Sequence, residues 1–124
     1  MGMRFTQDLS TGINVIRGYA NGELRVKENA YRGAVILSAA TLTDLPNVQN
    51  LEDLLKVDVA RILALEPELV LLGTGERQVF PAPGFGAQFL RAGIGFEVMD
   101  TSAACRTFNV LVAELRRVAA VLLL

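Results

Sequence analysis

Cys105 and Arg106 are the first residues of this chain to consider for chemistry, because they join the only cysteine to a cation in the stretch MDTSAACRTFNVL, residues 99–111. A thiolate is a nucleophile, and a neighbouring cation or a helix N-terminus lowers the pKa of a thiol. The chain contains no histidine, however. Cys-His dyads, Ser-His-Asp triads and histidine proton shuttles are therefore excluded. One cysteine without histidine also leaves no usable ligand set for a structural zinc site within one chain, so we expect no metal site.

Helical geometry separates Cys105 from Arg106. Asp100, Thr101 and Ser102, which can all cap a helix, stand at its expected start. An apolar stripe follows at helical spacing and consists of Ala104, Phe108, Leu111, Val112 and Leu115. At roughly 100° per residue, Cys105 falls at the edge of this stripe and Arg106 falls nearly opposite its centre. We therefore predict that Cys105 is a packed, mostly inert thiol and that Arg106 faces solvent.

The same helix start offers a site for a small anion, because free N–H groups, Thr101, Ser102 and an outward Arg106 could surround it. The alternative is a satisfied N-cap beside a solvated arginine, and the residue types favour that alternative.

A second candidate site is the turn Gly73-Thr74-Gly75, which ends an apolar run and is followed by Arg77. Glycines after a strand let backbone N–H groups approach a phosphate. The dinucleotide-binding fingerprint needs a third glycine where this chain has Gln78, so an ordinary turn is the favoured interpretation. The position still matters, because ligands collect at the carboxyl ends of parallel strands. In a largely parallel sheet, this turn would lie there and could meet the helix start at Asp100–Arg106.

The stiff apolar segment Phe80–Gly84, FPAPG, has two interpretations. It could be a corner that binds a partner protein, or a rigid lead into the next helix with Pro83 near the first turn, and the second is favoured. The carboxylates are scattered without the spacing of a catalytic pair, so we expect them at the solvated surface.

The elements that position these residues begin with β-structure. Two alternating runs, Ile13–Tyr19 and Glu23–Lys27, flank Asn21-Gly22, which is a strong signal of a β-hairpin. Continuous apolar runs then predict strands buried on both faces at Gly33–Ser38 and Leu69–Leu72.

Helices and strands alternate along the rest of the chain. Asn50 and Asp58 can each cap a short helix, and residues 84–93 form a third with Phe85 and Phe89 one turn apart. A strand at 95–99, a helix at 101–115 and a final strand at 117–124 follow. This order is typical of an α/β fold. We predict one three-layer domain, residues 1–124, with a mixed central sheet, helices on its faces and an N-terminal β-hairpin layer.

The overall composition limits the class of partner. Basic and acidic residues number 12 and 13 and are dispersed, so the sequence predicts no nucleic-acid partner. The N-terminal residues lack the apolar core of a secretory signal, and the longest apolar run, residues 118–124, is too short to span a bilayer. A single cysteine forms no internal disulfide, and we expect a cytoplasmic location.

Three segments together resemble one protein family: LLGTG at 71–75 with the following Phe80-Pro81, GIGFEVMDTSAACRTFNVL at 93–111, and RRVAAVLLL at 116–124. They are similar to the bacterial and archaeal proteins of unknown function related to mitochondrial complex I (NADH:ubiquinone oxidoreductase) assembly factor 3 and to the animal adipogenesis-associated domain proteins. The resemblance implies a compact α/β domain with a mixed sheet and a hairpin layer. It implies no catalytic residue or cofactor, only motif positions: Gly73, Thr74, Gly75, Phe80, Pro81, Asp100, Thr101, Cys105, Arg106 and Asn109.

One position departs from the family pattern near the end of the last helix. Leu115 stands near where relatives commonly have a glycine before the paired arginines Arg116-Arg117. A glycine there would end the helix in the left-handed conformation. Its absence predicts a helix that runs further or ends without a left-handed residue.

Two functions remain open. The first, favoured by the resemblance and by the poverty of catalytic side chains, is a non-enzymatic protein-interaction or assembly module. The second is a binder of a small anionic metabolite, or an enzyme acting on one, at the loops Gly73–Gly75 and Asp100–Arg106. Thr74 and Thr101 far apart or fully packed would argue against the second. The candidate residues for a ligand or partner are Gly73, Thr74, Gly75, Arg77, Asp100, Thr101, Cys105, Arg106 and Asn109.

Overall fold

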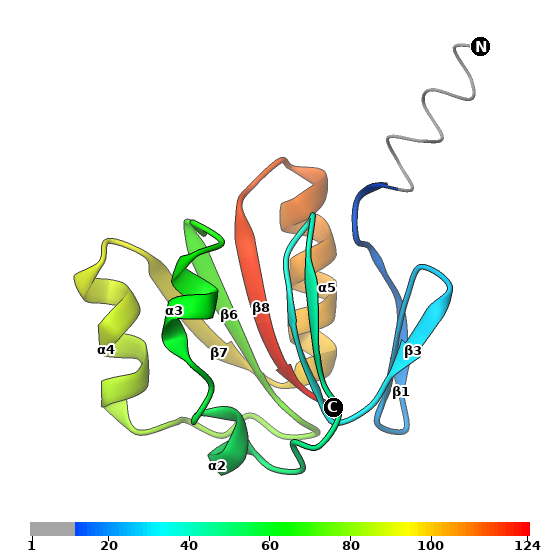
Figure 1. Ribbon diagram of the computed structural model, residues 1–124, viewed down its shortest axis with the longest axis horizontal. Helices are drawn as coiled ribbons and strands as arrows, with labels where there is room; N and C mark the ends of the chain where they lie inside the picture. Colours follow the sequence, from blue (N-terminus) through cyan, green and yellow to red (C-terminus); the bar gives the residue numbers. More distant parts are fainter. Residues whose placement is uncertain (1–11) are drawn as a thin grey trace.

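The computed structural model describes residues 12–124, which form a small and a large β-sheet with helices packed against the large one (Figure 1). Segment 1–11, on which the absence of a secretory signal depends, lies outside the described residues. The small sheet is an antiparallel meander of β1 (Ile16–Ala20), β2 (Glu23–Val26) and β3 (Asn29–Tyr31).

The hairpin predicted around Asn21-Gly22 is present between β1 and β2. Asn21 and Gly22 have φ values of 54° and 75°, as a two-residue turn between twisted strands requires. The sequence patterns missed β3, a three-residue strand that pairs with β2 after a second turn at Lys27 (φ 54°). The predicted hairpin layer is therefore three-stranded, and its first strand begins at Ile16 rather than Ile13.

The large sheet has the strand order β5-β4-β8-β6-β7. Its strands are β4 (Ala34–Leu37), β5 (Leu42–Leu45), β6 (Leu69–Thr74), β7 (Gly95–Met99) and β8 (Val118–Leu123). β6 is parallel to β7 and β8, whereas β4 is antiparallel to β5 and β8, so the sheet is mixed, as predicted. β5 was not predicted, because this short edge strand carries two polar residues and is only partly buried.

The connecting helices include α2 (Leu51–Leu54), α3 (Val59–Leu63), α4 (Pro83–Arg91) and α5 (Thr101–Ala113). The predicted caps are confirmed: Asn50 Oδ1 accepts from the N–H of Asp53 at 2.8 Å, and Asp58 Oδ1 accepts from that of Ala60 at 3.0 Å. Pro83 stands in the first turn of α4, where its fixed φ suits the helix and its missing N–H costs no bond.

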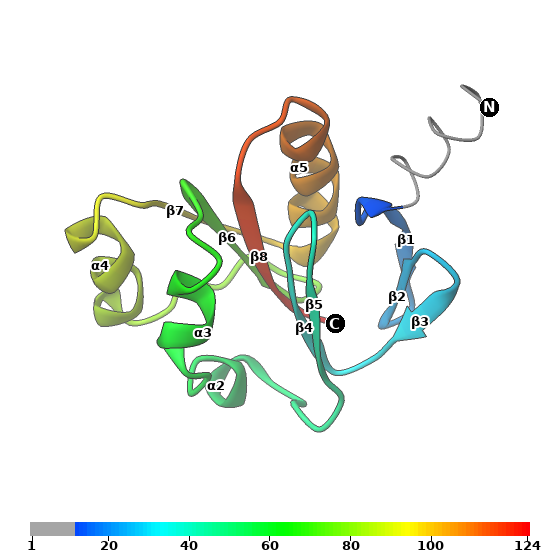
Figure 2. The ribbon, with the colours of Figure 1, turned by 45° about the horizontal axis from the view of Figure 1, so that its top comes forward.

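The two faces of the large sheet contribute to two separate cores. Val35 and Leu122 point toward α5 and the meander, whereas their neighbours Ile36 and Val121 point toward α2, α3 and α4. Successive residues of a strand alternate between faces, so the continuous apolar runs of β4, β6 and β8 fill both cores. Figure 2 shows the resulting layers, with α5 and the meander on one side of the sheet and α2–α4 on the other. This is the predicted arrangement.

The end of α5 corrects one prediction. The helix ends at Ala113, and Leu115 adopts the left-handed conformation with φ 63°. The N–H groups of Leu115 and Arg116 donate to the carbonyls of Val112 and Leu111 at 3.0 and 2.9 Å, the paired bonds of a Schellman motif. The prediction that the helix runs further or ends without a left-handed residue is therefore wrong. These two bonds hold a leucine in a conformation that glycine adopts more easily.

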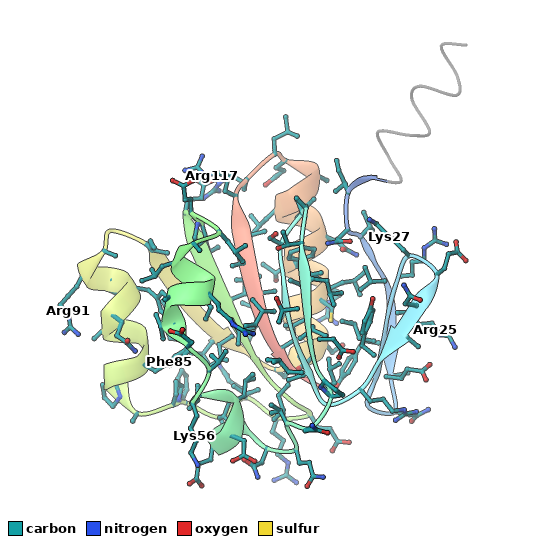
Figure 3. All side chains as sticks on the ribbon, in the orientation of Figure 1. Arg25, Lys27, Lys56, Phe85, Arg91 and Arg117 are labelled. Carbon is teal, nitrogen blue, oxygen red and sulfur yellow. The ribbon has the colours of Figure 1, made fainter. Side chains whose placement is uncertain are left out.

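Basic side chains lie on different elements at the periphery of the molecule. Figure 3 labels Arg25 and Lys27 on the meander, Lys56 after α2, Arg91 at the end of α4 and Arg117 before β8, and all of them are exposed. The absence of a nucleic-acid partner stays a prediction. Within residues 12–124, no helix combines the length and the apolar character that a membrane span requires.

Candidate functional site

The end of β6 and the start of α5 are joined by reciprocal hydrogen bonds. The N–H of Gly75 donates to Thr101 Oγ1 at 2.8 Å, and the N–H of Thr101 donates to the Gly75 carbonyl at 2.9 Å. The Thr101 hydroxyl donates in turn to the carbonyl of Leu123, in β8, at 2.6 Å. The two loops of the candidate site therefore meet at the carboxyl ends of β6 and β8.

Gly73 makes this junction possible because α5 begins directly over it. A Cβ atom on Gly73 would lie 2.9 Å from Thr101 Oγ1 and 2.8 Å from the side chain of Leu122, closer than packed atoms allow. Gly75 has φ 96° and turns the chain out of β6. Both glycines thus serve the packing of α5 on β6.

Thr74 has its hydroxyl engaged within the chain. It donates to the carbonyl of Arg77 and accepts from the N–H of Val79 at 3.0 Å. Thr74 and Thr101 are both buried, so neither hydroxyl is available to a ligand. The two threonines therefore cannot serve as ligand-binding groups of the site suggested at these loops. Arg77, in the turn after β6, is exposed.

The N-terminus of α5 is capped by the chain itself. Asp100 Oδ1 accepts from the N–H of Ala103 at 2.8 Å, so a carboxylate already occupies the place where an external anion would sit. Arg106 is exposed and donates from Nη1 to Ser102 Oγ at 3.0 Å. The helix start thus has the satisfied N-cap that the residue types favour.

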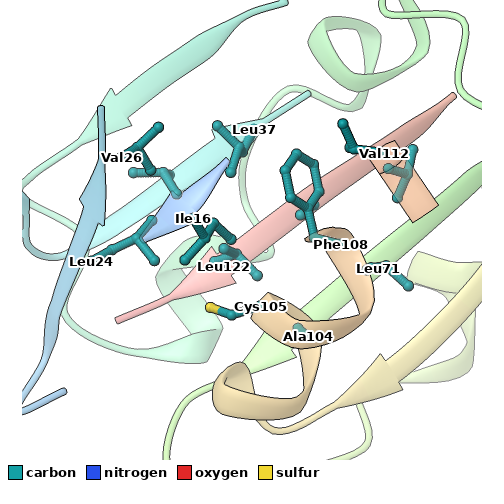
Figure 4. Close-up of a cluster of buried hydrophobic side chains, with 13 residues drawn as sticks. Ile16, Leu24, Val26, Leu37, Leu71, Ala104, Cys105, Phe108, Val112 and Leu122 are labelled. Carbon is teal, nitrogen blue, oxygen red and sulfur yellow. The ribbon is translucent and has the colours of Figure 1, made fainter. Parts of the chain in front are cut away.

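Cys105 is a packed thiol, 6% exposed, in the core that contains Ile16 and Phe108 (Figure 4). Burial raises the pKa of this thiol to about 12, while Arg106 lowers it to a smaller extent and Asp100 raises it. Burial therefore outweighs the neighbouring arginine. The thiol stays protonated near neutral pH and is not an activated nucleophile.

Asn109 fastens β1 to α5. Its Oδ1 accepts from the N–H of Ile16 at 2.9 Å, and its Nδ2 donates to the Ile16 carbonyl at 2.8 Å. Beside this contact the β1–β2 register shifts between Ile16 and Gly18, which leaves Arg17 as an extra, bulged residue. An amide can donate and accept together, so Asn109 supplies the bonds that a paired strand would supply.

Asn14 is a structural residue that the sequence patterns missed. It is buried, and its Nδ2 donates to the carbonyls of Ser38 and Thr41 at 2.9 and 3.0 Å. These bonds tie the segment before β1 to the turn between β4 and β5. The sequence signal that could have indicated its role is a polar residue between the apolar Ile13 and Val15.

The part of the chain that the structure describes contains no cluster of three or more His, Cys, Asp or Glu that could hold a metal ion. Every buried side-chain nitrogen or oxygen in that part also has a hydrogen-bond partner. The described interior therefore presents no orphaned polar atom toward a missing ligand.

Arg77 lines a surface cavity of about 630 Å³ at the carboxyl ends of β6 and β8. Arg32 and Glu76 also line it, and Arg32 is already paired with Glu23 at 3.5 Å. Mixed charge and an occupied arginine make this cavity a poor anion site. Arg77 and Arg106, which the sequence assigned to one site, lie in separate depressions.

A second depression, of about 480 Å³, is an apolar groove between α4 and the edge strand β7. Phe80 and Leu90 stand on it, 74% and 62% exposed, and Phe96 and Val98 of β7 contribute to its lining. The segment FPAPG thus leads into α4, as favoured, and also lines a groove. We call this depression the α4–β7 groove.

Residues 16–123 match the sequence pattern of a family described as a protein of unknown function (DUF498/DUF598). The chain is 31% identical over 106 residues to the 13 kDa major membrane protein of Francisella tularensis, which covers 85% of this chain and 86% of the relative. Among solved structures, the chain is similar to a crystal structure of a Bordetella parapertussis protein. The TM-score is 0.81 at 33% identity, with 90% of this chain and 96% of that chain covered.

A eukaryotic relative matches over a shorter span. The chain is 38% identical over 74 residues to NADH dehydrogenase [ubiquinone] 1 alpha subcomplex assembly factor 3 of Xenopus tropicalis, which is 60% of this chain and 39% of that protein. The match therefore concerns one part of the larger protein.

Proposed function

Because the chain belongs to the DUF498/DUF598 family of proteins of unknown function, we propose its function from its own surface: it is a non-enzymatic protein-interaction module of the assembly type. Its docking site is the α4–β7 groove, and the occupant is an extended apolar segment of a different protein. The observation that carries this proposal is the 74% exposure of Phe80 beside an apolar groove.

The exposed side chains of the groove are suited to burial against a partner. Phe80 and Leu90 both line the α4–β7 groove and expose large apolar side chains there. Contiguous apolar patches of this kind mark interaction sites. Phe80 also stands beside Pro81 and Pro83, which restrict the backbone. A stiff segment loses little conformational entropy when a partner binds.

The floor of the groove is preformed. The ring of Phe96 stacks on that of Phe89, with centroids 5.6 Å apart, and meets that of Phe85 edge-on at 5.7 Å. Gly86 lets α4 approach this ring, because a Cβ there would lie 2.6 Å from a ring atom of Phe96. The aromatic packing thus fixes α4 against β7 and keeps the groove's shape.

The edge strand β7 offers backbone bonds to an extended partner. The N–H of Gly95 donates inward to the Glu68 carbonyl at 3.0 Å, whereas the Val98 carbonyl accepts from Gln78 Nε2 at 3.0 Å, outside the sheet. Because a strand's backbone groups alternate in direction, those of Phe96 share the outward side with Val98. A peptide strand can bond such an edge.

Two further points support a binding role over catalysis. The chain lacks histidine, and its one thiol is buried and protonated. The Xenopus relative carries the name of an assembly factor, a role performed through protein contacts; the extension to this chain is by analogy.

The proposed setting is the cytoplasm. One cysteine requires no oxidising compartment. The Francisella relative is named a membrane protein, so fractionation of source cells is the direct check. Recovery with the membranes after a high-salt wash would contradict the cytoplasmic assignment.

A photo-crosslinking amino acid at position 80 tests the docking site. Cross-linking in source cells is expected to join position 80 to one defined protein, and the purified pair is then measured by calorimetry. Leu90→Gln removes apolar surface from the groove and is expected to weaken binding roughly ten- to a hundredfold, which corresponds to about 1.5–3 kcal/mol for one buried leucine.

Val110 supplies the matched control, since it is 56% exposed on α5, away from the groove. Val110→Gln should leave the affinity unchanged, and a cross-linker at position 110 should not capture the same protein. Capture of the same proteins from both positions, a homodimer as the cross-linked product, or full affinity in Leu90→Gln would each overturn the proposal.

A further inference from the structure

A third depression lies on the other side of the large sheet, between residues 16–19 of β1 and the first turns of α5, with a volume of about 220 Å³. We call it the β1–α5 crevice. It borders the core that contains Cys105, whereas the α4–β7 groove borders the core that contains Phe85. An inference about the crevice is therefore independent of the proposed function.

A β-bulge and a side-chain amide shape the backbone beside the crevice. The bulge at Arg17 interrupts the β1–β2 ladder, and bulges commonly redirect a side chain beside a functional site. Asn109 then bonds both backbone groups of Ile16, at 2.9 and 2.8 Å. These two contacts fix β1 at a set position against α5, and the exposed Arg17 contributes to the lining of the crevice.

The lining of the crevice is cationic. Arg17 and Arg106 both contribute to it, and no carboxylate does. Among the described residues, neither arginine forms an ion pair: the four ion pairs found there involve other cations. Arginine is planar and carries several N–H donors, so two of them at one small depression match the oxygens of a tetrahedral anion.

Neutral donors complete the lining. Ser102 Oγ accepts from Arg106 Nη1 at 3.0 Å, which leaves the hydroxyl proton of Ser102 free to donate. The thiol of Cys105 is protonated, so it adds no negative charge. Asp100 and Glu76 do not line the crevice, although both carboxylates raise the pKa of Tyr19, which does line it. The Asp100 carboxylate caps Ala103.

We propose that the β1–α5 crevice binds the phosphate group of a small ligand through Arg17, Arg106 and Ser102. This differs from binding at the N-terminus of α5, which Asp100 already caps. The small volume admits the phosphate and a short substituent. The phosphate belongs either to a free phosphomonoester or to a phospholipid headgroup, and the experiment separates these two sources.

The test titrates the ¹⁵N-labelled protein with sn-glycerol 3-phosphate, followed by NMR, with glycerol as the uncharged control. Saturable shifts are expected at the amides of Arg17, Gly18, Ser102 and Arg106. Arg17→Gln and Arg106→Gln should each weaken binding at least about tenfold, as expected for the loss of charge-assisted hydrogen bonds. Dispersed spectra of both variants verify that they fold.

Arg91→Gln is the charge-matched control, because Arg91 is exposed on α4 and lies outside the crevice. In a second arm, the protein is sedimented with phosphatidylglycerol or phosphatidylcholine vesicles. Binding to phosphatidylglycerol alone, lost in Arg106→Gln and kept in Arg91→Gln, assigns the phosphate to a lipid. Silence in both arms, shifts confined to the cavity of Arg32 and Arg77, or an equal effect of Arg91→Gln overturns the proposal.

Discussion

Gly75 and Thr101 exchange two hydrogen bonds, of 2.8 and 2.9 Å, that close the end of β6 onto the start of α5. The Thr101 hydroxyl then reaches the Leu123 carbonyl of β8 at 2.6 Å. One buried threonine thereby connects the two parallel strands at the centre of the sheet with the helix that covers them. The glycine turn, for which the sequence favoured an ordinary turn over a phosphate site, connects three elements in the fold.

Replacing Thr101 by valine tests the joint. The substitution keeps the shape and removes the hydroxyl, so the buried Gly75 N–H and Leu123 carbonyl each lose a partner. We expect the free energy of unfolding to fall by about 2–4 kcal/mol, because each buried unpaired group costs about 1–3 kcal/mol. Urea denaturation measures the change. Thr101→Ser retains the hydroxyl and should cost clearly less; equal losses in the two variants would refute the assignment.

Replacing Asn109 by leucine should release β1 locally. The Ile16 N–H and carbonyl lose both of their bonds to Asn109, with an expected cost of about 1–3 kcal/mol. Hydrogen exchange should quicken at Ile16 and along β1 and β2, while amides of β6 and β8 keep their order of protection. Faster exchange spread evenly over the chain would contradict a role confined to this contact.

The parts of the fold that were predictable are those with short-range causes. Asn21-Gly22 specifies its turn through positive φ, and Asn50 and Asp58 specify helix starts through their own side chains. The alternation of helices and strands then limits the architecture to layers around a mixed sheet.

Pairing between segments that are far apart in the sequence could not be predicted from local sequence patterns. β3 and β5 are short and partly exposed, so their strand character comes from partners across the sheet rather than from apolar runs. Asn109 bonds a residue 93 positions away, which no local period reveals. The loops of the candidate site did meet, but the use of both threonine hydroxyls within the fold depends on packing that spacing alone does not encode.

Leu115→Gly should stabilise the protein. Leu115 has φ 63° and is 86% exposed. Its side chain therefore gains little packing energy to offset the strain of the left-handed backbone. Glycine adopts this conformation freely, and we expect a gain of about 0.5–1 kcal/mol in thermal or urea unfolding. Ala113→Gly, at the last residue of the same helix, should instead cost stability, by at most about 1 kcal/mol. A loss of stability in Leu115→Gly would show that contacts of the leucine side chain stabilise the fold by more than the left-handed backbone conformation costs.

Gly73→Ala should destabilise the protein, because the added methyl group would press on Thr101 and Leu122 at 2.9 and 2.8 Å. Helix α5 must shift, and we expect a cost of about 1–3 kcal/mol, the usual range for overpacking. Gly18→Ala is the control, since a Cβ on Gly18 meets no atom within 4 Å. Similar stability losses in the two variants would mean that close packing is not the reason for glycine at position 73.

Cys105 should make stability fall in alkaline solution. Burial raises the pKa of its thiol from 9.0 to about 12, so the folded state holds the proton more tightly than the unfolded state. The stabilisation is complete below about pH 9 and is lost as the pH rises toward 12, with a slope approaching about 1.4 kcal/mol per pH unit. Burial also raises the pKa of Tyr19, and the charge of the Cys105 thiolate raises it to a smaller extent; Cys105→Ala keeps the part that comes from burial and loses the part that comes from the thiolate. The free energy of unfolding, measured from about pH 8 to about pH 10.5, should therefore decline more steeply in the wild type than in Cys105→Ala. Parallel curves for the two proteins would show that the thiol titrates normally and is not sealed in the core.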